Sequence, residues 1–249
     1  MNIFYNALLF YSRIRVPKNV VCTAETLNKA YRFLPLVGLI VGMISAAVFF
    51  MAQGVNLPKE VSIVLAMAAM ILTTGALHED GLADFADGFG AGRDKDSILR
   101  IMKDSHIGTY GVLILIVSLL LKYVLLTELP KGELIRSIIV AQGMSRLVAL
   151  LMVYRSTYVL REGAKSAHNV VKLSTKDLLI ATAFGLLPLA CMPWEMAAIY
   201  LLFAFILFAG FKRYIERKIG GYTGDTLGAL IQLSELLFYL VVLATAKTY

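Results

Sequence analysis

Long apolar runs separated by short polar segments divide the chain from end to end. Each run is long enough to cross the roughly 30 Å hydrocarbon core of a bilayer as a helix. The runs lie near residues 33–53, 61–77, 108–127, 137–153, 178–211 and 227–246. The run at 178–211 contains Pro188 and Pro193, which indicates two spans joined by a turn at the membrane interface. The pattern therefore predicts an all-α, polytopic integral membrane bundle with about seven transmembrane helices.

The N-terminal segment, residues 1–32, precedes the first of these runs. Met1–Tyr11 is apolar, but it has no cationic region before it and no small-residue cleavage site after it, so it does not resemble a cleaved signal peptide. We expect a helix at the membrane interface here, and whether it crosses the membrane as an additional span is left open. Because no internal repeat is found, residues 1–249 are predicted to form a single membrane domain.

The composition supports lipid as the main solvent of this protein. Of its 249 residues, 59% are hydrophobic and 16% are charged, and the mean hydropathy is +0.75. A soluble domain has about 25% charged residues. The net charge of +7 would favour nucleic acid as a partner of a soluble protein, but here the basic residues lie between apolar runs. We therefore expect a lipid bilayer and no nucleic acid as partner.

Lysine and arginine are distributed unevenly between the two sides of the predicted bundle. The segments on one side contain 18 of the 24 basic residues, and those on the other side contain four. The segments on the richer side are 1–32, 79–107, 154–177 and 212–226. Loops that face the cytoplasm carry an excess of Lys and Arg. The richer side is therefore predicted to face the cytoplasm.

The residues that most strongly suggest chemistry follow the second apolar run, within an acidic segment at 79–107 that we interpret as an active-site loop. Asp80, Asp84 and Asp87 are spaced so that they share one face of a helix continuing from the second span. Three carboxylates on one stripe repel each other, and a hard divalent cation such as Mg²⁺ or Mn²⁺ offsets this repulsion. A solvated acidic face is the alternative, but idle charge beside a bilayer is costly, which favours the metal site.

Further candidates follow these aspartates. Gly88 permits close approach of the backbone to a ligand. Arg93 and Lys103 can bind phosphate oxygens, with anchoring at the membrane surface as the alternative. Asp104 is either a fourth metal ligand or the N-cap of the third span.

A second polar motif, at residues 212–226, leads into the last span. Gly224 and Asp225 begin a helix after a Gly-Gly turn, where backbone N–H groups can bind a phosphate. The alternative is that Asp225 simply caps this helix. Glu235, further along the span, needs a buried partner, and Arg146 in the fourth span is the candidate.

Several of these motifs together resemble the hallmark of the adenosylcobinamide-GDP ribazoletransferase family, also called cobalamin-5′-phosphate synthase. In chain order they are LHEDGLADFADG at 77–88, GRD at 92–94 and IMKDSHIG at 101–108. The runs FLPLVG at 33–38 and GGYTGDTLGA at 220–229 are similar to the family as well, so the likeness covers about residues 30 to 235. Phe85 departs from the pattern, which expects a smaller residue such as threonine, but this leaves the carboxylates untouched.

The resemblance implies a reaction, its substrates and a metal ion. The family transfers the cobinamide-phosphate moiety of adenosylcobinamide-GDP to α-ribazole or α-ribazole 5′-phosphate and releases GMP, with Mg²⁺, at the bacterial inner membrane. In this reaction the ribose 3′-hydroxyl attacks the phosphorus next to the aminopropanol. The residues expected to be catalytic and to hold Mg²⁺ are Asp80, Asp84, Asp87 and Asp104. Those expected to bind substrate are Gly88, Arg93, Lys103, Gly224 and Asp225.

Two other classes of protein share parts of this pattern. A CDP-alcohol phosphotransferase has a similar acidic motif, but it requires Asp-Gly-x-x-Ala-Arg, whereas here Arg93 follows Asp87-Gly88 one residue too late. An ion-coupled transporter places charge near the bilayer midplane, often in inverted repeats, and no such repeat is found in this sequence.

The interactions of the chain with other proteins are left open. A homo-oligomer and contacts with other enzymes of the corrinoid pathway are the two open alternatives to a chain that acts alone. Gly38 and Gly42 lie four residues apart in the first span, a spacing that predicts close helix packing either within the chain or across a dimer.

Overall fold

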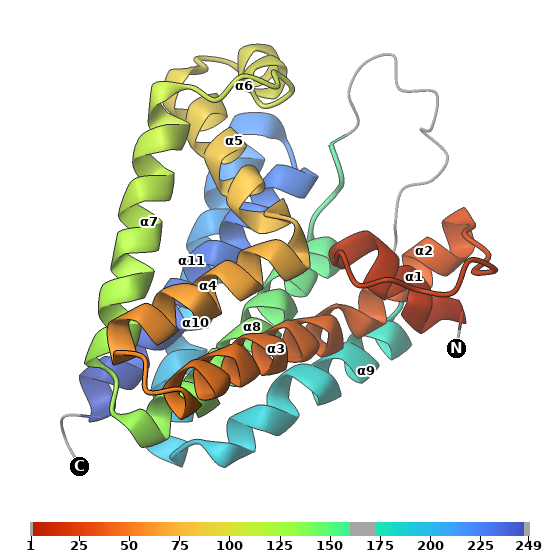
Figure 1. Ribbon diagram of the computed structural model, residues 1–249. Coiled ribbons are helices and arrows are strands. Elements are labelled where there is room, and N and C mark those ends of the chain that lie inside the picture. Colours follow the sequence, from red (N-terminus) through yellow and green to blue (C-terminus); the bar gives the residue numbers. More distant parts are fainter. Residues whose placement is uncertain (1, 160–172, 247–249) are drawn as a thin grey trace.

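The computed structural model describes residues 2–159 and 173–246 of the chain. In these residues the regular structure is helical (Figure 1), apart from one isolated bridge between Tyr158 and Tyr222. The α-helices are α1 (Asn2–Tyr11), α2 (Ala24–Ala30), α3 (Leu34–Gly54), α4 (Lys59–Thr74), α5 (Leu77–Ala91), α6 (Lys95–Ile101), α7 (Thr109–Glu128), α8 (Lys131–Arg155), α9 (Thr175–Leu186), α10 (Trp194–Ile219) and α11 (Gly224–Ala246). Two 3-10 helices, Tyr31–Phe33 and Leu187–Cys191, follow α2 and α9. The predicted all-α class is confirmed.

Five helical segments of the described residues are long and apolar enough to cross a membrane. They are Ala24–Gly54, which joins α2 to α3, and Thr109–Glu128, Gly132–Arg155, Trp194–Ile219 and Gly224–Ala246. The pair α4 and α5 makes a sixth if the bent pair is counted as one span. The N-terminal α1, with 10 residues, is too short to cross a bilayer by itself. The chain is thus a multi-pass membrane protein, but it has fewer spans than the seven expected.

The difference in number arises in the apolar run at 178–211. α9 ends at Leu186 after 12 residues, which is about 18 Å of helix. Pro188 follows in a 3-10 helix, because proline has no N–H to donate and its ring clashes with the preceding turn of an α-helix. α10 starts at Trp194, directly after Pro193, and runs for 26 residues. The run therefore contains one helix of spanning length instead of two.

A sharp bend separates α4 from α5. The two helices meet at 85°, and the two residues between them, Gly75 and Ala76, adopt left-handed backbone conformations with φ of 69° and 60°. The helix that was expected to continue from the second span therefore ends at Thr74. The segment 79–107, expected to be a loop, instead contains most of α5 and all of α6. Figure 1 shows α5 rising from this bend toward α6, with α7 and α11 packed beside it.

Glycines in α3 allow it to pack closely against α8. A Cβ atom at Gly38 would overlap the carbonyl oxygen of Gln142 and lie 2.8 Å from its carbonyl carbon. A Cβ atom at Gly42 would lie 2.7 Å from the Cα atom of Ile139. The predicted close packing of these two glycines is therefore confirmed within the chain.

We predict that Gly38→Ala lowers the stability of the protein, because the new methyl group meets backbone atoms of α8 that cannot move aside independently. The expected loss is about 1–3 kcal/mol, typical of overpacking. Thermal unfolding in detergent measures it, with Gly210→Ala in α10 as the matched control, since nothing lies within 4 Å of a Cβ atom there. Equal unfolding temperatures for the two variants would contradict the close packing.

Candidate active site

A cavity of about 360 Å³ lies where α5 and α11 meet the N-terminal segment, a size typical of small-molecule sites. Its apolar and aromatic lining includes Phe10, Tyr11, Tyr31, Leu34, Leu77, Tyr158, Leu227 and Ile231. Its polar lining consists of His78, Asp80, Gly224 and Asp225. Of the residues predicted from the sequence to form the site, the cavity therefore brings together Asp80, Gly224 and Asp225, which come from two motifs far apart in the chain.

α5 and α11 cross almost backbone to backbone beside this cavity. A Cβ atom at Gly81 would lie 3.0 Å from the carbonyl oxygen of Asp225 and 3.2 Å from the Cα atom of Gly228. A Cβ atom at Gly228 would lie 3.2 Å from the Cα atom of Gly81. Any side chain at either position would push the two backbones apart. The crossing is therefore what places Asp80, the neighbour of Gly81, on the same cavity as Asp225.

The start of α11 is capped by threonine and not by aspartate. The Thr223 hydroxyl accepts a hydrogen bond from the Thr226 backbone N–H at 3.3 Å, and the Thr226 hydroxyl accepts one from the Thr223 backbone N–H at 2.9 Å. This reciprocal pair is a capping box. The alternative in which Asp225 caps this helix is therefore wrong. Asp225 lies in the first turn, where its side chain faces the cavity.

Three tyrosines of the cavity lining, Tyr11, Tyr31 and Tyr158, were not predicted from the sequence, and neither was Tyr222, which packs against Tyr158. The ring centroids of Tyr11 and Tyr31 are 5.8 Å apart, and those of Tyr158 and Tyr222 are 5.4 Å apart. Burial raises the pKa of Tyr11 and also that of Tyr222, so both phenols stay neutral at physiological pH. A signal was present, because Tyr222 belongs to the second motif and Tyr11 ends the apolar N-terminal segment.

Asp87 holds the start of α7. One of its carboxylate oxygens accepts the backbone N–H of Gly108 at 2.7 Å, and the other accepts that of Gly111 at 2.9 Å. The side chain of Asp87 is buried, and the first turn of a helix favours a negative charge. Asp87 therefore ties α5 to α7, and its role as a metal ligand stays a prediction.

Asp84, another candidate, lies on α5 between Asp80 and Asp87. It is half-buried, one turn beyond Asp80. The ring of Phe85, the residue that departs from the family pattern, packs against Phe89 and Phe211 at centroid distances of 4.5 and 5.2 Å. Phe85 therefore fills space between α5 and α10.

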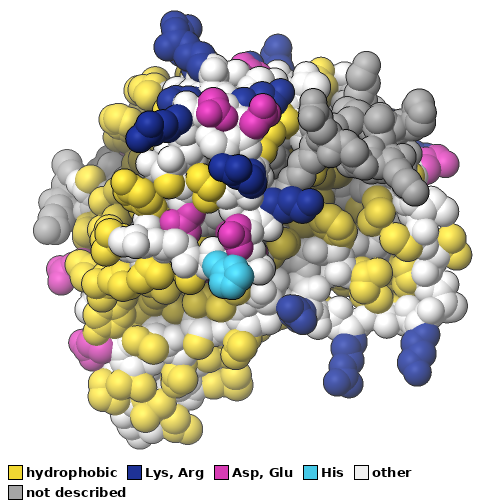
Figure 2. All heavy atoms as spheres, turned by 90° about the horizontal axis from the view of Figure 1, so that it is seen from above, with side chains coloured by type: hydrophobic (Ala, Val, Ile, Leu, Met, Phe, Trp, Pro, Cys, Tyr) yellow, Lys and Arg dark blue, Asp and Glu magenta, His cyan; other side chains and the backbone are white. Residues whose placement is uncertain are grey.

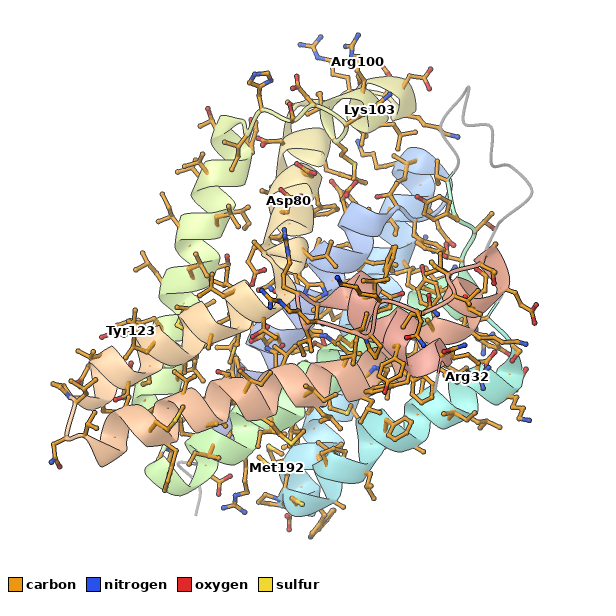
Figure 3. The ribbon with its side chains drawn as sticks, turned by 45° about the vertical axis from the view of Figure 1, so that its right-hand side comes forward. Arg32, Asp80, Arg100, Lys103, Tyr123 and Met192 are labelled. Carbon is orange, nitrogen blue, oxygen red and sulfur yellow. The ribbon has the colours of Figure 1, made fainter. Side chains whose placement is uncertain are left out.

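The remaining predicted residues lie at the end of the bundle formed by α6. Figure 2 looks down on this end and shows basic and acidic side chains gathered there. Arg93 and Lys103 are exposed, and Figure 3 shows Lys103, in the turn after α6, apart from Asp80 on α5. Gly88 packs against Met102, and a Cβ atom at Gly88 would lie only 3.1 Å from the Met102 sulfur. None of these residues is part of the cavity lining.

Asp104 lies at the same end and is exposed. Its carboxylate accepts the backbone N–H of His106 at 3.0 Å and pairs with the His106 ring nitrogen Nδ1 at 2.7 Å. The hydrogen bond from the His106 ring lowers the pKa of Asp104. The N-cap of α7 is Gly108, so the expectation that Asp104 caps the third span is wrong. Its role as a metal ligand stays a prediction.

The arrangement of carboxylates limits how a metal ion can bind. Among the described residues, no three His, Cys, Asp or Glu side chains are grouped so as to hold an ion. Mg²⁺, however, is commonly bound by one or two carboxylates, with substrate phosphates and water completing its shell. Asp80 and Asp225, which line one cavity, fit this second arrangement.

A buried polar network lies behind the cavity, between α5, α7 and α11. Lys122 pairs with Glu235 at 3.0 Å and also donates to the Gln232 side-chain oxygen at 3.1 Å. The Gln232 amide donates to Glu79 at 3.0 Å, and the Tyr239 hydroxyl donates to Glu235 at 3.1 Å. The buried partner of Glu235 is therefore Lys122.

The expected ion pair between Arg146 and Glu235 is not found, because Glu235 pairs with Lys122 instead. Arg146 is buried and donates to the backbone and side-chain oxygens of Gln142 at 2.8 and 2.7 Å. It also lies 3.5 Å from Nδ1 of His78. The signal for the correct pair was Lys122 itself, an isolated charge in an otherwise apolar run.

The fold and the cavity together define a class: a multi-pass helical membrane protein with an acidic, aromatic-walled site. The model of the family described as cobalamin-5-phosphate synthase matches residues 3–243. The chain therefore belongs to the cobalamin-5-phosphate synthase family, which makes it a transferase.

Curated relatives agree with this assignment. A protein of Shewanella frigidimarina, named adenosylcobinamide-GDP ribazoletransferase, is 43% identical over 249 residues, covering 98% of this chain and 95% of the relative. Proteins of the same name from Shewanella oneidensis and Shewanella baltica are 44% and 43% identical and cover 98% and 99% of this chain and 94% and 95% of their own. No solved structure matches the chain.

Removing the positive member of the buried pair should be costly. We predict that Lys122→Met destabilises the protein by about 3–5 kcal/mol, because it leaves Glu235 without its cation in an apolar interior. The double variant Lys122→Met/Glu235→Leu should recover much of this loss. Thermal unfolding in detergent tests both, and a double variant as unstable as Lys122→Met would contradict the pairing.

Asp87→Asn should weaken the junction of α5 and α7, because the amide can accept only one of the two N–H bonds. We expect a loss of about 1–3 kcal/mol, of equal size with and without Mg²⁺. Asp96→Asn, at an exposed position of α6, is the matched control. A variant that unfolds like the wild type in the absence of Mg²⁺ would show that Asp87 does not hold α7.

Proposed function

We propose that the chain transfers the cobinamide-phosphate moiety of adenosylcobinamide-GDP to α-ribazole or α-ribazole 5′-phosphate and releases GMP. The family and the names of the relatives support this reaction. The observation that assigns this reaction to a particular site is that Asp80 and Asp225 line the same aromatic-walled cavity. The family assignment also favours this reaction over a CDP-alcohol phosphotransferase or a transporter.

In the proposed reaction the ribose 3′-hydroxyl oxygen forms a new bond to the phosphorus next to the aminopropanol. The bond from this phosphorus to the GMP phosphate breaks, GMP keeps the electron pair, and the hydroxyl proton passes to a base. Phosphoryl transfer of this kind depends mainly on positioning and on neutralisation of charge. Either Asp80 or Asp225 is the candidate base, because each presents a carboxylate to the cavity.

Mg²⁺ is part of the proposal: one of Asp80 and Asp225 would hold it, and the other would act as the base. The ion would neutralise charge on the diphosphate. Asp84, one turn further along α5, is the next candidate ligand. Arg93 and Lys103, at the α6 end, would act on the anionic substrate through their long-range field.

The walls of the cavity support a division of the substrates. The aromatic side chains can stack against the flat, apolar ring of α-ribazole. A cavity of about 360 Å³ is too small for a whole corrinoid. We infer that the cavity holds the acceptor and the diphosphate, and that the corrin ring stays outside it, against the protein surface or the lipid.

The orientation in the membrane is also proposed. The α6 end would face the cytoplasm of a bacterial inner membrane. The segment 79–107 forms this end, and the sequence assigns it to the side of the bundle that is richer in Lys and Arg.

The test is the release of GMP from adenosylcobinamide-GDP by Asp80→Asn and Asp225→Asn in membranes, with α-ribazole 5′-phosphate as acceptor. We expect each variant to lose at least about 100-fold in rate, as removal of an acid–base group or metal ligand commonly causes. The loss should be partly reversed by raised Mg²⁺ in the variant that lacks the metal ligand. Asp96→Asn, with its side chain away from the cavity, should react at the wild-type rate.

Wild-type rates in both variants would refute the proposed site. If wild-type membranes instead released CMP from a CDP-linked lipid, or moved an ion without forming GMP, the proposed reaction itself would be wrong.

A further inference from the structure

The described residues that line the cavity include the acidic residues Asp80 and Asp225 and no lysine or arginine. A diphosphate substrate would add more negative charge. Arg93 and Lys103, expected to bind phosphate, are not part of the lining, and Figure 3 shows Lys103, in the turn after α6, apart from Asp80 on α5; Arg13 is not part of the lining either, but it contacts the bend from which α5 starts.

Arg13 lies between two segments that form the wall of the cavity. Tyr11, two residues before it, lines the cavity, and so does Leu77, which follows the bend after α4. The backbone N–H of Arg13 donates to the carbonyl oxygen of Thr73 at 2.7 Å. This bond fixes the N-terminal segment to the bend.

The side chain of Arg13 crosses Gly75 at this bend. A Cβ atom at Gly75 would lie 3.0 Å from Cγ and 3.2 Å from Cδ of Arg13, and it would overlap Nε. Glycine at this position therefore serves two purposes: it adopts the left-handed conformation that ends α4, and it leaves room for the arginine. The Arg13 side chain therefore runs across the backbone of the bend at Gly75, although the residue is exposed.

The guanidinium of Arg13 differs from those of Arg32 and Arg155. Arg32 pairs with Asp177 at 2.8 Å, and Arg155 lies over the Tyr154 ring at 5.6 Å from its centroid. Within the described part of the chain, the Arg13 guanidinium makes no hydrogen bond or ion pair. A positioned arginine with its donors unused beside an acidic pocket is suited to an anionic ligand.

We propose that Arg13 binds a phosphate of the diphosphate substrate at the rim of the cavity that contains Asp80 and Asp225. The proposal rests on the function proposed above. The planar guanidinium donates two parallel hydrogen bonds to a phosphate, which fixes the orientation of the diphosphate as well as its charge. The N-terminal segment is then part of the substrate site, and its role is not limited to anchoring the chain at the membrane surface.

The experiment compares Arg13→Gln and Arg13→Lys with Arg100→Gln, a matched control on the exposed surface of α6. Two quantities are measured on the purified full chain in detergent or lipid: the KM for each substrate, and the Kd for inorganic diphosphate with Mg²⁺. Arg13→Gln should raise the KM for adenosylcobinamide-GDP and the Kd for diphosphate by about 10- to 100-fold, the effect of losing hydrogen bonds to a charged group. The KM for the acceptor should change little, and Arg13→Lys should retain part of the binding.

Arg100→Gln should bind diphosphate like the wild type, and all three variants should unfold at the wild-type temperature. An unchanged Kd for diphosphate in Arg13→Gln would overturn the proposal. So would an equal rise in both KM values accompanied by a lower unfolding temperature, because that result indicates a purely structural role. The diphosphate measurement does not depend on turnover. A wild-type protein that binds diphosphate but releases no GMP would refute the proposed reaction, and the Kd of Arg13→Gln for diphosphate would still decide the role of Arg13.

Discussion

The close crossing of α5 and α11 is the contact on which the rest of the site depends. Gly81 lies against the backbone of Asp225 and Gly228, so the two helices approach more closely than any pair of side chains would allow. The contact unites two motifs that are about 140 residues apart in the sequence, and it presents one carboxylate from each to a single cavity. Without it, Asp80 and Asp225 would not line the same cavity.

The remaining features of the fold hold α5 in the position that this crossing requires. The bend at Gly75 and Ala76 turns α5 away from α4 by 85°. Asp87 ties the far end of α5 to the first turn of α7. The network from Lys122 through Gln232 to Glu79 attaches the same helix to α7 and α11 inside the bundle. Asp87 and the chain of hydrogen bonds from Lys122 through Gln232 to Glu79 therefore join α5 to α7 and α11 through buried side chains.

The sequence was sufficient for the helical class, and three of the residues that it singled out line the candidate cavity. Apolar runs of spanning length and the unequal distribution of basic residues depend only on local composition, and Asp80, Gly224 and Asp225 were all identified as site residues. The bend after α4 was not predicted, because an apolar run with one glycine does not reveal a left-handed pair of residues. The partner of Glu235 and the positions of Arg93, Lys103 and Asp104 depend on how helices pack, which no single sequence reveals. Arg13 was not singled out from the sequence, since its relation to Gly75 exists only in three dimensions.

The most direct test of the account is the structure of this protein with Mg²⁺ and a non-hydrolysable analogue of adenosylcobinamide-GDP, determined by cryo-electron microscopy in lipid. The account predicts that the diphosphate lies in the cavity between α5 and α11, with its phosphorus atoms near the carboxylates of Asp80 and Asp225. A diphosphate bound at the α6 end, against Arg93 and Lys103 and outside the cavity, would contradict it.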